Sequence, residues 1–152
     1  EYDEDLNIFK LERCLVSSLQ YPINYGFIPR TIALDDDPLD VLVFNHDPID
    51  RAVLVSCRIL GVLGFTDGGK IDNKLIAVPH WSPEEKYKTI KDIESSHLKI
   101  FREFFKIYKI DRASETEVGR WTSVAKAKEI LLDAHKRWLK KGGKQKMWND
   151  PR

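Results

Sequence analysis

Four carboxylates crowd into six residues of the chain, at Asp35, Asp36, Asp37 and Asp40. Carboxylates at such close range repel one another and raise one another's pKa, which is typical of a site that binds cations or shares a proton. Two β-prone runs flank the cluster, at 30–34 and 41–44, and Pro38 inside it excludes a helix. The pattern predicts a short, stiff acidic loop between two strands, with Asp35 and Asp37 facing the same way.

A second acidic loop is expected at residues 66–74, where glycines interrupt the apolar pattern between two strands. Taken alone, Asp67 and Asp72 read as ordinary turn residues beside Gly68 and Gly69. Because both acidic loops are expected at the ends of neighbouring strands of one small sheet or barrel, their carboxylates can converge on one pocket. An oxygen-rich set of this kind suits a hard divalent cation.

Two common motifs for such chemistry do not match the chain. An EF-hand loop that started at Asp35 would need glycine at its sixth position and glutamate at its twelfth, but Asp40 and His46 stand there. No segment matches the phosphate-binding pattern GxxxxGK followed by Ser or Thr. Neither an EF-hand nor a P-loop is therefore expected.

The first half of the chain is expected to be mainly strand. Apolar runs bounded by turn residues predict strands at 41–44, 52–65 and 75–80, in addition to 30–34. Residues 1–16 show partial alternation around a polar turn and predict a hairpin. These strands would carry the two acidic loops at their ends.

The later part of the chain is expected to be helical. Ser82 followed by Pro83 and two acids predicts a helix that runs to about Ile93. Ser95 or Ser96 is expected to cap a second helix that ends near residues 108–109. Its apolar positions fall at helical spacing and predict core packing: Leu98, Phe101, Phe104, Phe105 and Tyr108.

The C-terminal third helix is preceded by a less regular stretch. Residues 110–121 are expected as loop and short extended pieces. Thr122 is expected to cap a long helix that ends at the glycines 142–143. The remaining tail, 143–152, is polar enough to move freely or to pack on a neighbour.

Length and composition set the class of protein. A chain of 152 residues, 42% of them hydrophobic, fits one globular domain over 1–152. Its formal charge of +1 favours neither nucleic acid nor an anionic membrane as partner. No apolar run approaches the roughly 20 residues of a membrane span, and no signal-peptide pattern opens the chain, so a cytoplasmic protein is expected. Because the chain starts at Glu1 rather than Met, residues upstream are expected in the natural protein.

The stretch 21–29, Tyr-Pro-Ile-Asn-Tyr-Gly-Phe-Ile-Pro, followed by the acids of 35–40, resembles the signature of the family I soluble inorganic pyrophosphatases. Further segments occur in the family's order and at its approximate spacing: 57–63, 66–67, Asp72, 74–79 and 104–109. The resemblance implies metal-dependent hydrolysis of inorganic pyrophosphate to two phosphates by in-line attack of a metal-activated water. It also implies an α+β fold, mainly β: a small OB-like five-stranded β-barrel with an additional hairpin and two to three helices packed outside.

The resemblance implies Mg²⁺ as cofactor, several ions per site, with Mn²⁺ or Zn²⁺ as possible substitutes. The metal ligands that it implies are Asp35, Asp40, Asp67, Asp72 and Glu1. Asp37 corresponds to the general base that accepts a hydrogen bond from the nucleophilic water, and Tyr21 to a tyrosine that hydrogen-bonds within the metal site. Asp36 is expected to face solvent.

Four residues correspond to groups that hold phosphate oxygens: Arg13, Lys74, Tyr108 and Lys109. Tyr25 corresponds to an active-site tyrosine, so the implied catalytic set is Asp37, Tyr25, Lys109 and Arg13. Pyrophosphate is highly charged and repels a water nucleophile unless cations neutralise it, which is the physical reason for such a set. By its spacing alone, Arg13 reads more readily as a surface side chain than as an anion clamp.

The expected ligands are pyrophosphate and phosphate, and the resemblance suggests a homo-oligomer, either dimer or hexamer. Two other functions compete with hydrolysis. One is a catalytically inactive pyrophosphatase-like module that binds divalent cations or anions. The other is an OB-like nucleic-acid binder, which should line its face with Lys, Arg and aromatic residues, whereas these loops are acidic. An assay of phosphate release from pyrophosphate distinguishes the hydrolase from the inactive module.

Overall fold

The structure is a computed structural model that describes residues 2–3, 6, 8–11, 18–109 and 116–142. The strands are β1 Tyr2–Asp3, β2 Ile8–Phe9, β3 Asn24–Ile28, β4 Leu39–Val43, β5 Cys57–Asp67, β6 Lys70–Ile71, β7 Lys74–Pro79 and β8 Thr116–Thr122. The helices are α1 Ser95–Ile107 and α2 Val124–Lys140, with two 3₁₀ turns, η1 Pro83–Lys86 and η2 Ile90–Asp92. Two expected site residues, Glu1 and Arg13, lie outside the described residues, as does the tail 143–152.

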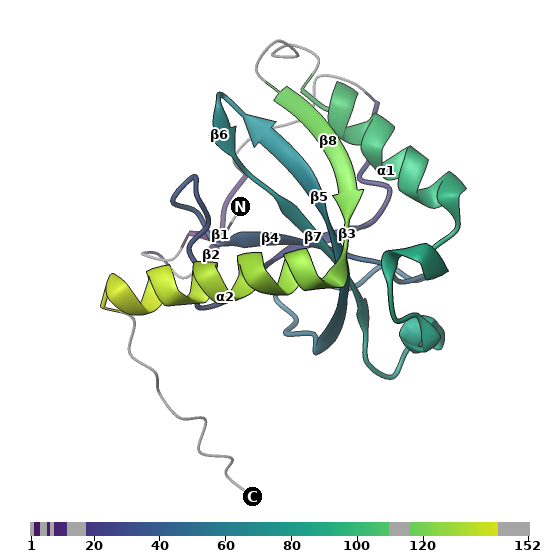
Figure 1. Cartoon of the computed structure of the whole chain (residues 1–152), viewed down its shortest axis with the longest axis horizontal. Helices are drawn as coiled ribbons and strands as arrows, with labels where there is room; N and C mark the ends of the chain where they lie inside the picture. Colours follow the sequence, from purple (N-terminus) through teal and green to yellow (C-terminus); the bar gives the residue numbers. More distant parts are fainter. Residues whose placement is uncertain (1, 4–5, 7, 12–17, 110–115, 143–152) are drawn as a thin grey trace, which may run out of the picture.

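The main sheet has six strands in the order β3-β4-β7-β5-β6, with β8 also paired to β5 (Figure 1). Thr66 and Asp67 of β5 pair with both β6 and β8, and Val62 and Leu63 pair with both β7 and β8. Because a strand has two sides, β6 and β7 share one side of β5 and β8 takes the other. Across the sheet the order is therefore β3, β4, β7, β5, β8, with the short β6 beside β7 on the same side of β5. This arrangement agrees with the expected α+β, OB-like fold.

This sheet is open in the described part of the chain, with β3 and β8 at its edges. Among the described strands of this sheet, β4 and β7 pair in parallel and the other pairings are antiparallel. The additional hairpin expected near the N-terminus is confirmed by the antiparallel pair β1–β2, with two residues in each strand. Residues 12–16 of the expected hairpin lie outside the described residues. Among the described residues, no helix has the length and apolar character that crossing a membrane requires.

The sheet is covered on both faces, because its side chains alternate between two core clusters. One cluster packs on α1, and its strand residues are Leu42, Leu60, Leu63, Phe65, Ile76 and Val78. The other packs on α2, and its strand residues are Leu39, Val41, Val43, Val62, Leu75 and Ala77. The central strand β7 is buried along its whole length, as expected of a strand covered on both sides.

Both long helices expected from the sequence are confirmed, with small shifts at their starts. The aromatic stripe of α1 is core: Phe101, Phe104, Phe105 and Tyr108 are all buried. The residue before α1 is Glu94 rather than Ser95 or Ser96. The cap of α2 is Ser123, whose hydroxyl accepts from the backbone N–H of Lys126, one residue later than expected.

The expected strand at 30–34 is wrong; the strand before the acidic loop is β3, at 24–28. Arg30 has a φ of 60°, which ends the extended chain. The backbone of Ile32 then bonds α2 instead of a neighbouring strand: its N–H donates to the Ala134 carbonyl at 3.0 Å, and its carbonyl accepts from Arg137 Nε at 2.8 Å. The apolar character of this run reflects burial against α2, where Ala33 is buried.

The expected helix from Ser82 to Ile93 is also wrong, because only the two short 3₁₀ turns form there. Arg58 Nη1 donates to the carbonyls of Glu85 and Tyr87, at 2.5 and 3.4 Å, and thereby occupies acceptors that a continuous helix would use. The Asp92 carboxylate accepts from the N–H of Thr89 at 2.7 Å and starts a new turn.

Residues 116–122 form the edge strand β8, where loop and short extended pieces were expected. The strand follows β5 closely, since a Cβ on Gly119 would stand 3.1 Å from the Gly64 carbonyl oxygen. Edge position explains why its sequence is polar and lacks a strong strand signal. The expected strand at 52–65 corresponds to β5, which starts only at Cys57, so residues 52–56 are not part of it.

Two glycines of β5 provide a test of this packing. A Cβ at Gly61 would stand 2.6 Å from the Thr122 carbonyl oxygen, whereas at Gly64 the nearest atom would be 3.8 Å away. We expect Gly61→Ala to destabilise the protein by about 1–3 kcal/mol, because the backbones of β5 and β8 must separate. Gly64→Ala, the matched control, should change stability by less than about 1 kcal/mol. Urea unfolding measures both, and equal midpoints for the two variants would contradict the close approach.

Candidate active site

A buried lysine lies at the centre of the residues that the sequence singled out. The side chain of Lys74, at the start of β7, is only 2% exposed; its Nζ lies 2.6 Å from Asp40 Oδ2 and 2.8 Å from Asp72 Oδ2. The parallel pairing of β4 and β7 places Val41 beside Leu75, so the preceding residues Asp40 and Lys74 are neighbours. Asp72, two residues earlier, points to the same side.

Aromatic rings form the apolar side of this cluster. Lys74 Nζ lies 4.8 Å from the centre of the Phe65 ring and 5.9 Å from that of Phe105. The ring face attracts the ammonium, but it offers no hydrogen-bond acceptor of the kind that water would provide. The two carboxylates must therefore supply the interactions that keep Lys74 charged in the interior.

With both carboxylates ionised, the cluster holds one positive and two negative charges. Burial alone would lower the pKa of Lys74, but Asp40 and Asp72 outweigh it and hold that pKa above its ordinary value. Burial raises the pKa of Asp72 to about 7; the negative charges of Asp40 and Asp35 add to this, and Lys74 opposes it. The site thus carries surplus negative charge that a further cation would relieve.

Tyr25 of β3 closes one side of the cluster. Its hydroxyl donates to Asp40 Oδ2, the same oxygen that contacts Lys74. Although part of the side chain is exposed, its hydroxyl is removed from water against Asp40; this desolvation, together with the charge of Asp40, raises the pKa of Tyr25 well above its ordinary value. Tyr25 is therefore a hydrogen-bond donor that orients Asp40.

Two hydrogen bonds within the acidic loop hold part of its shape. Asp35 Oδ1 accepts from the N–H of Asp37 at 3.2 Å, and the Asp37 carbonyl accepts from the N–H of Ala33 at 2.7 Å. Burial, with the charges of Asp37 and Asp40, raises the pKa of Asp35. Asp37 itself is exposed, so its carboxylate is accessible to water and ligands.

Asp36 faces solvent as expected, with 72% of its side chain exposed. Its φ of 81° is in the left-handed region, which Asp tolerates better than most residues. Lys141 Nζ lies 2.9 Å from Asp36 Oδ1 and lowers the pKa of that carboxyl. Asp36 is thus separate from the buried cluster.

A second ion pair joins the other expected site residues. The β5–β6 hairpin turns through Gly68 and Gly69, with φ values of 53° and 78°, and leaves Asp67 facing Lys109, whose Nζ donates to its Oδ2. The lysine follows directly on Tyr108, a buried residue whose ring lies 6.2 Å from that of Phe65. The Asp67–Lys109 pair and the Lys74 cluster therefore lie beside the same group of aromatic rings, which includes Phe65 and Tyr108.

We tested the expected metal ligands against this geometry. Over the described ranges, no three His, Cys, Asp or Glu side chains are arranged to hold a metal ion together. The available donors nevertheless fit a hard divalent cation: Asp35, Asp40 and Asp72 supply carboxylate oxygens, and the charge of Asp40 raises the pKa of each of the other two. The chemistry of these donors therefore suits a hard divalent cation, although the carboxylates do not converge on a single metal position in the described residues.

One residue near the site was not singled out from the sequence. Lys70, on β6, reaches across to the acidic loop, where its Nζ donates to the Asp35 carbonyl at 3.5 Å. The Gly68-Gly69 turn indicates a two-residue hairpin, which places Lys70 opposite Asp67. The turn chemistry was thus available in the sequence, but the contact with a loop 35 residues earlier was not.

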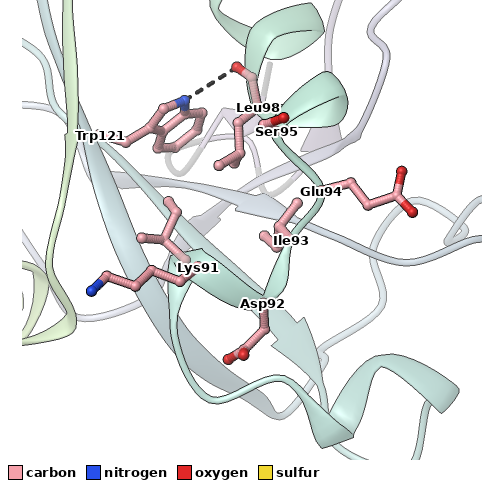
Figure 2. A pocket seen from close by; sticks show the side chains of 8 residues that line it. Lys91, Asp92, Ile93, Glu94, Ser95, Leu98 and Trp121 are labelled. Atoms are coloured by element: carbon pink, nitrogen blue, oxygen red, sulfur yellow. Dashed lines mark hydrogen bonds between the residues drawn. The ribbon is translucent and has the colours of Figure 1, made fainter.

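A separate hollow of about 490 Å³ lies between η2, the start of α1 and β8 (Figure 2). Ile93, Leu98 and Trp121 form much of its wall, and Trp121 Nε1 donates to the Leu98 carbonyl at 3.1 Å. None of the expected site residues that the structure describes lines it. The chemistry suggested by the sequence therefore belongs to the Lys74 cluster and not to this hollow.

Comparison with known proteins agrees with the geometry. A family model described as inorganic pyrophosphatase matches residues 1–139. The inorganic pyrophosphatase of Halalkalibacterium halodurans is 39% identical over 139 residues, which cover 91% of this chain and 85% of that protein. That of Synechocystis sp. is 42% identical over 125 residues, covering 82% and 74% respectively. The range matched by the family model contains both acidic loops, Lys74 and Lys109.

A solved structure supports the same comparison at the level of the fold. The crystal structure of inorganic pyrophosphatase from Thermus thermophilus superposes with a TM-score of 0.87 at 34% identity. The superposition covers 91% of this chain and 82% of that one. The likeness therefore extends over most of both chains, not only over the acidic motif.

The raised pKa of Asp72 predicts a pH-dependent stability. Its folded-state pKa of about 7 lies above the ordinary 3.8, so the folded state binds more protons between these values, and the stability that Asp72 contributes falls as pH rises from about 4 to about 7. Asp72→Asn removes this dependence. In metal-free buffer at pH 8 we expect the variant to be more stable than the parent by roughly 1–4 kcal/mol, and the two to converge near pH 4.

Urea unfolding in EDTA at pH 4, 6 and 8 measures this difference. Asp36→Asn is the matched control, since the pKa of Asp36 is lowered and not raised. A parent protein that is more stable than Asp72→Asn at pH 8 would show that the attraction of Lys74 outweighs the loss of water, against this expectation.

Proposed function

The chain belongs to the inorganic pyrophosphatase family and hydrolyses inorganic pyrophosphate; we propose that it does so at the Lys74 cluster, by in-line attack of a metal-activated water. The observation that carries the proposal is the buried Asp40–Lys74–Asp72 cluster, with its surplus negative charge. Acidic groups that take up cations, beside lysines that take up anions, fit a substrate that is a metal-bound polyanion.

We propose Mg²⁺ as the cofactor, several ions per site, with Mn²⁺ or Zn²⁺ as substitutes. The ligands would be Asp35, Asp40, Asp67, Asp72 and Glu1. When bound, such ions neutralise pyrophosphate oxygens and lower the pKa of a bound water. Hard carboxylate donors and the raised pKa values of Asp35 and Asp72 support this choice over a soft metal.

Asp37 acts as general base in this proposal, accepting a proton from the attacking water. Its exposed carboxylate is accessible to that water, while its backbone is fixed at both ends, by Asp35 Oδ1 and by the N–H of Ala33. Tyr25 keeps its proton, because its pKa is well above the ordinary value, and holds Asp40 in place through its hydroxyl. Proton transfer and positioning are thus assigned to different residues.

Four residues would hold the phosphate groups: Lys74, Lys109, Tyr108 and Arg13. Charge develops on the leaving phosphate during in-line attack, and preorganised cations stabilise it. Lys109 is suited to this role because its ammonium is only partly buried and its present partner, Asp67, is a single carboxylate. Lys109, Arg13, Tyr25 and Asp37 form the catalytic set.

Further parts of the proposal rest on the sequence and on the family resemblance. We place residues 1–152 in one catalytic domain, expect a homo-oligomer, dimer or hexamer, and expect the cytoplasm as its location. Pyrophosphate and phosphate are its ligands, without nucleic acid or membrane. Light scattering of the purified chain measures the assembly directly.

The first experiment is phosphate release from pyrophosphate with Mg²⁺, compared with the same protein in EDTA. We expect release with Mg²⁺ and none in EDTA, because the polyanion is not neutralised without the metal. A folded protein with its natural upstream residues that binds Mg²⁺ but releases no phosphate would favour the inactive cation- or anion-binding module.

Asp37→Asn tests the assignment of the general base. The amide cannot accept a proton, so we expect kcat to fall by roughly 10²–10⁴-fold while Mg²⁺ binding, followed by calorimetry, is kept. Asp36→Asn is the matched control, since it removes the same charge from the exposed side chain of the preceding residue. It should retain parental turnover. Loss of Mg²⁺ binding in Asp37→Asn would make Asp37 a ligand and not the base.

A further inference from the structure

The acidic loop depends on contacts from outside its own sheet. Between β3 and β4 the chain contains two non-glycine residues at positive φ, Arg30 at 60° and Asp36 at 81°. Such conformations are unfavourable for residues with a Cβ and persist only where neighbouring groups hold them. The loop also carries Asp35 and Asp37, whose positions matter for the proposed chemistry.

The C-terminal half of α2 supplies these contacts. The Ala134 carbonyl accepts from the N–H of Ile32 at 3.0 Å, and Arg137 Nε donates to the Ile32 carbonyl at 2.8 Å. His135 Nδ1 lies 2.8 Å from the Arg30 carbonyl and donates to it. The side-chain contacts join residues 105 positions apart in the chain.

Of these side chains, Arg137 makes the contact that is hardest to replace. Its bond to the Ile32 carbonyl is partly buried, and a hydrogen bond from a charged donor is stronger than one from a neutral donor. The Lys141–Asp36 pair lies at the exposed surface, where ion pairs contribute little. Ala134 is fully buried and in the same core cluster as Ala33, so the helix and the loop approach closely at this point.

We propose that Arg137 is a positioning residue for the hydrolysis, an inference that rests on the proposed function. By holding the Ile32 carbonyl, it fixes the loop that presents Asp35 and Asp37 to the site. The cations that would hold substrate, Lys74 and Lys109, lie on β7 and just after α1, outside this loop. Arg137 therefore affects the position of the carboxylates of Asp35 and Asp37, and not the lysines that would bind substrate.

The test compares Arg137→Ala and Arg137→Lys with Lys136→Ala. Lys136 is the adjacent residue on α2, exposed and paired with Asp133 at 3.0 Å, so its loss removes the same charge without touching the loop. In Arg137→Ala we expect kcat to fall about tenfold, because misplacement of a catalytic group by about 1 Å can cost up to 10²-fold. The KM for pyrophosphate should stay within about twofold. Arg137→Lys should restore part of the rate, and Lys136→Ala should keep the parental values.

A second measurement does not depend on turnover. Amide hydrogen exchange of the metal-free full chain should rise in Arg137→Ala at Ile32, Ala33 and Asp37, while the amides of β5 and β7 keep their parental protection. If the parent chain releases no phosphate, the proposed function fails and the exchange result alone decides whether Arg137 positions the loop. The two failures are thus distinguishable.

Three results would overturn the inference: unchanged loop exchange in Arg137→Ala, an equal loss of kcat in Lys136→Ala, or raised exchange of the same size throughout the sheet. The last would mean general destabilisation. If Arg137→Ala does not fold, Arg137→Lys decides the matter. A lowered kcat with faster exchange confined to the loop supports positioning, and parental values of both overturn it.

Discussion

The contact of one buried ammonium with two carboxylates is the constraint on which the site depends. Lys74 is charged in a place where water is excluded, and that is tolerable only because Asp40 and Asp72 both lie within hydrogen-bond distance. When both are ionised, those two carboxylates carry one more negative charge than Lys74 neutralises. The same interaction therefore keeps Lys74 charged in the interior and leaves the site receptive to cations, which links the packing of β4 and β7 to the proposed chemistry.

Much of this site was predictable from residue types. Crowded acids in two loops indicated cation chemistry, and the family resemblance assigned roles to residues that the structure brings together, including Tyr25, Asp40, Asp72 and Lys74. The contact between Asp40 and Lys74 was not predictable from spacing, because it joins residues 34 positions apart. It follows from the parallel pairing of β4 with β7, and no local pattern in the chain specifies that register.

The misplaced elements share a physical cause, which is that distant side chains compete for local backbone groups. Arg58 takes carbonyls that a helix over 82–93 would need, and α2 takes the backbone of Ile32 that a strand over 30–34 would need. The strand β8 was missed for the opposite reason: a polar edge strand needs only one partner, and β5 supplies it. The long helices were predictable because their apolar faces repeat along the chain itself.

At both lysines of the site, a phosphate group would compete with carboxylates for the ammonium, and this bears on the order in which the contacts with substrate form. A phosphate group that binds Lys109 must take the ammonium from Asp67, and one that binds Lys74 must share it with Asp40 and Asp72. Exchange at Lys109 involves a single carboxylate at a partly exposed position, whereas Lys74 is buried and contacts two. Lys109 is therefore the easier of the two for an anion to recruit, and Lys74 responds to substrate mainly through the charge balance of its carboxylates. On this argument the Asp67–Lys109 pair is the part of the site that must rearrange first, while the Lys74 cluster remains the fixed part against which the substrate is oriented.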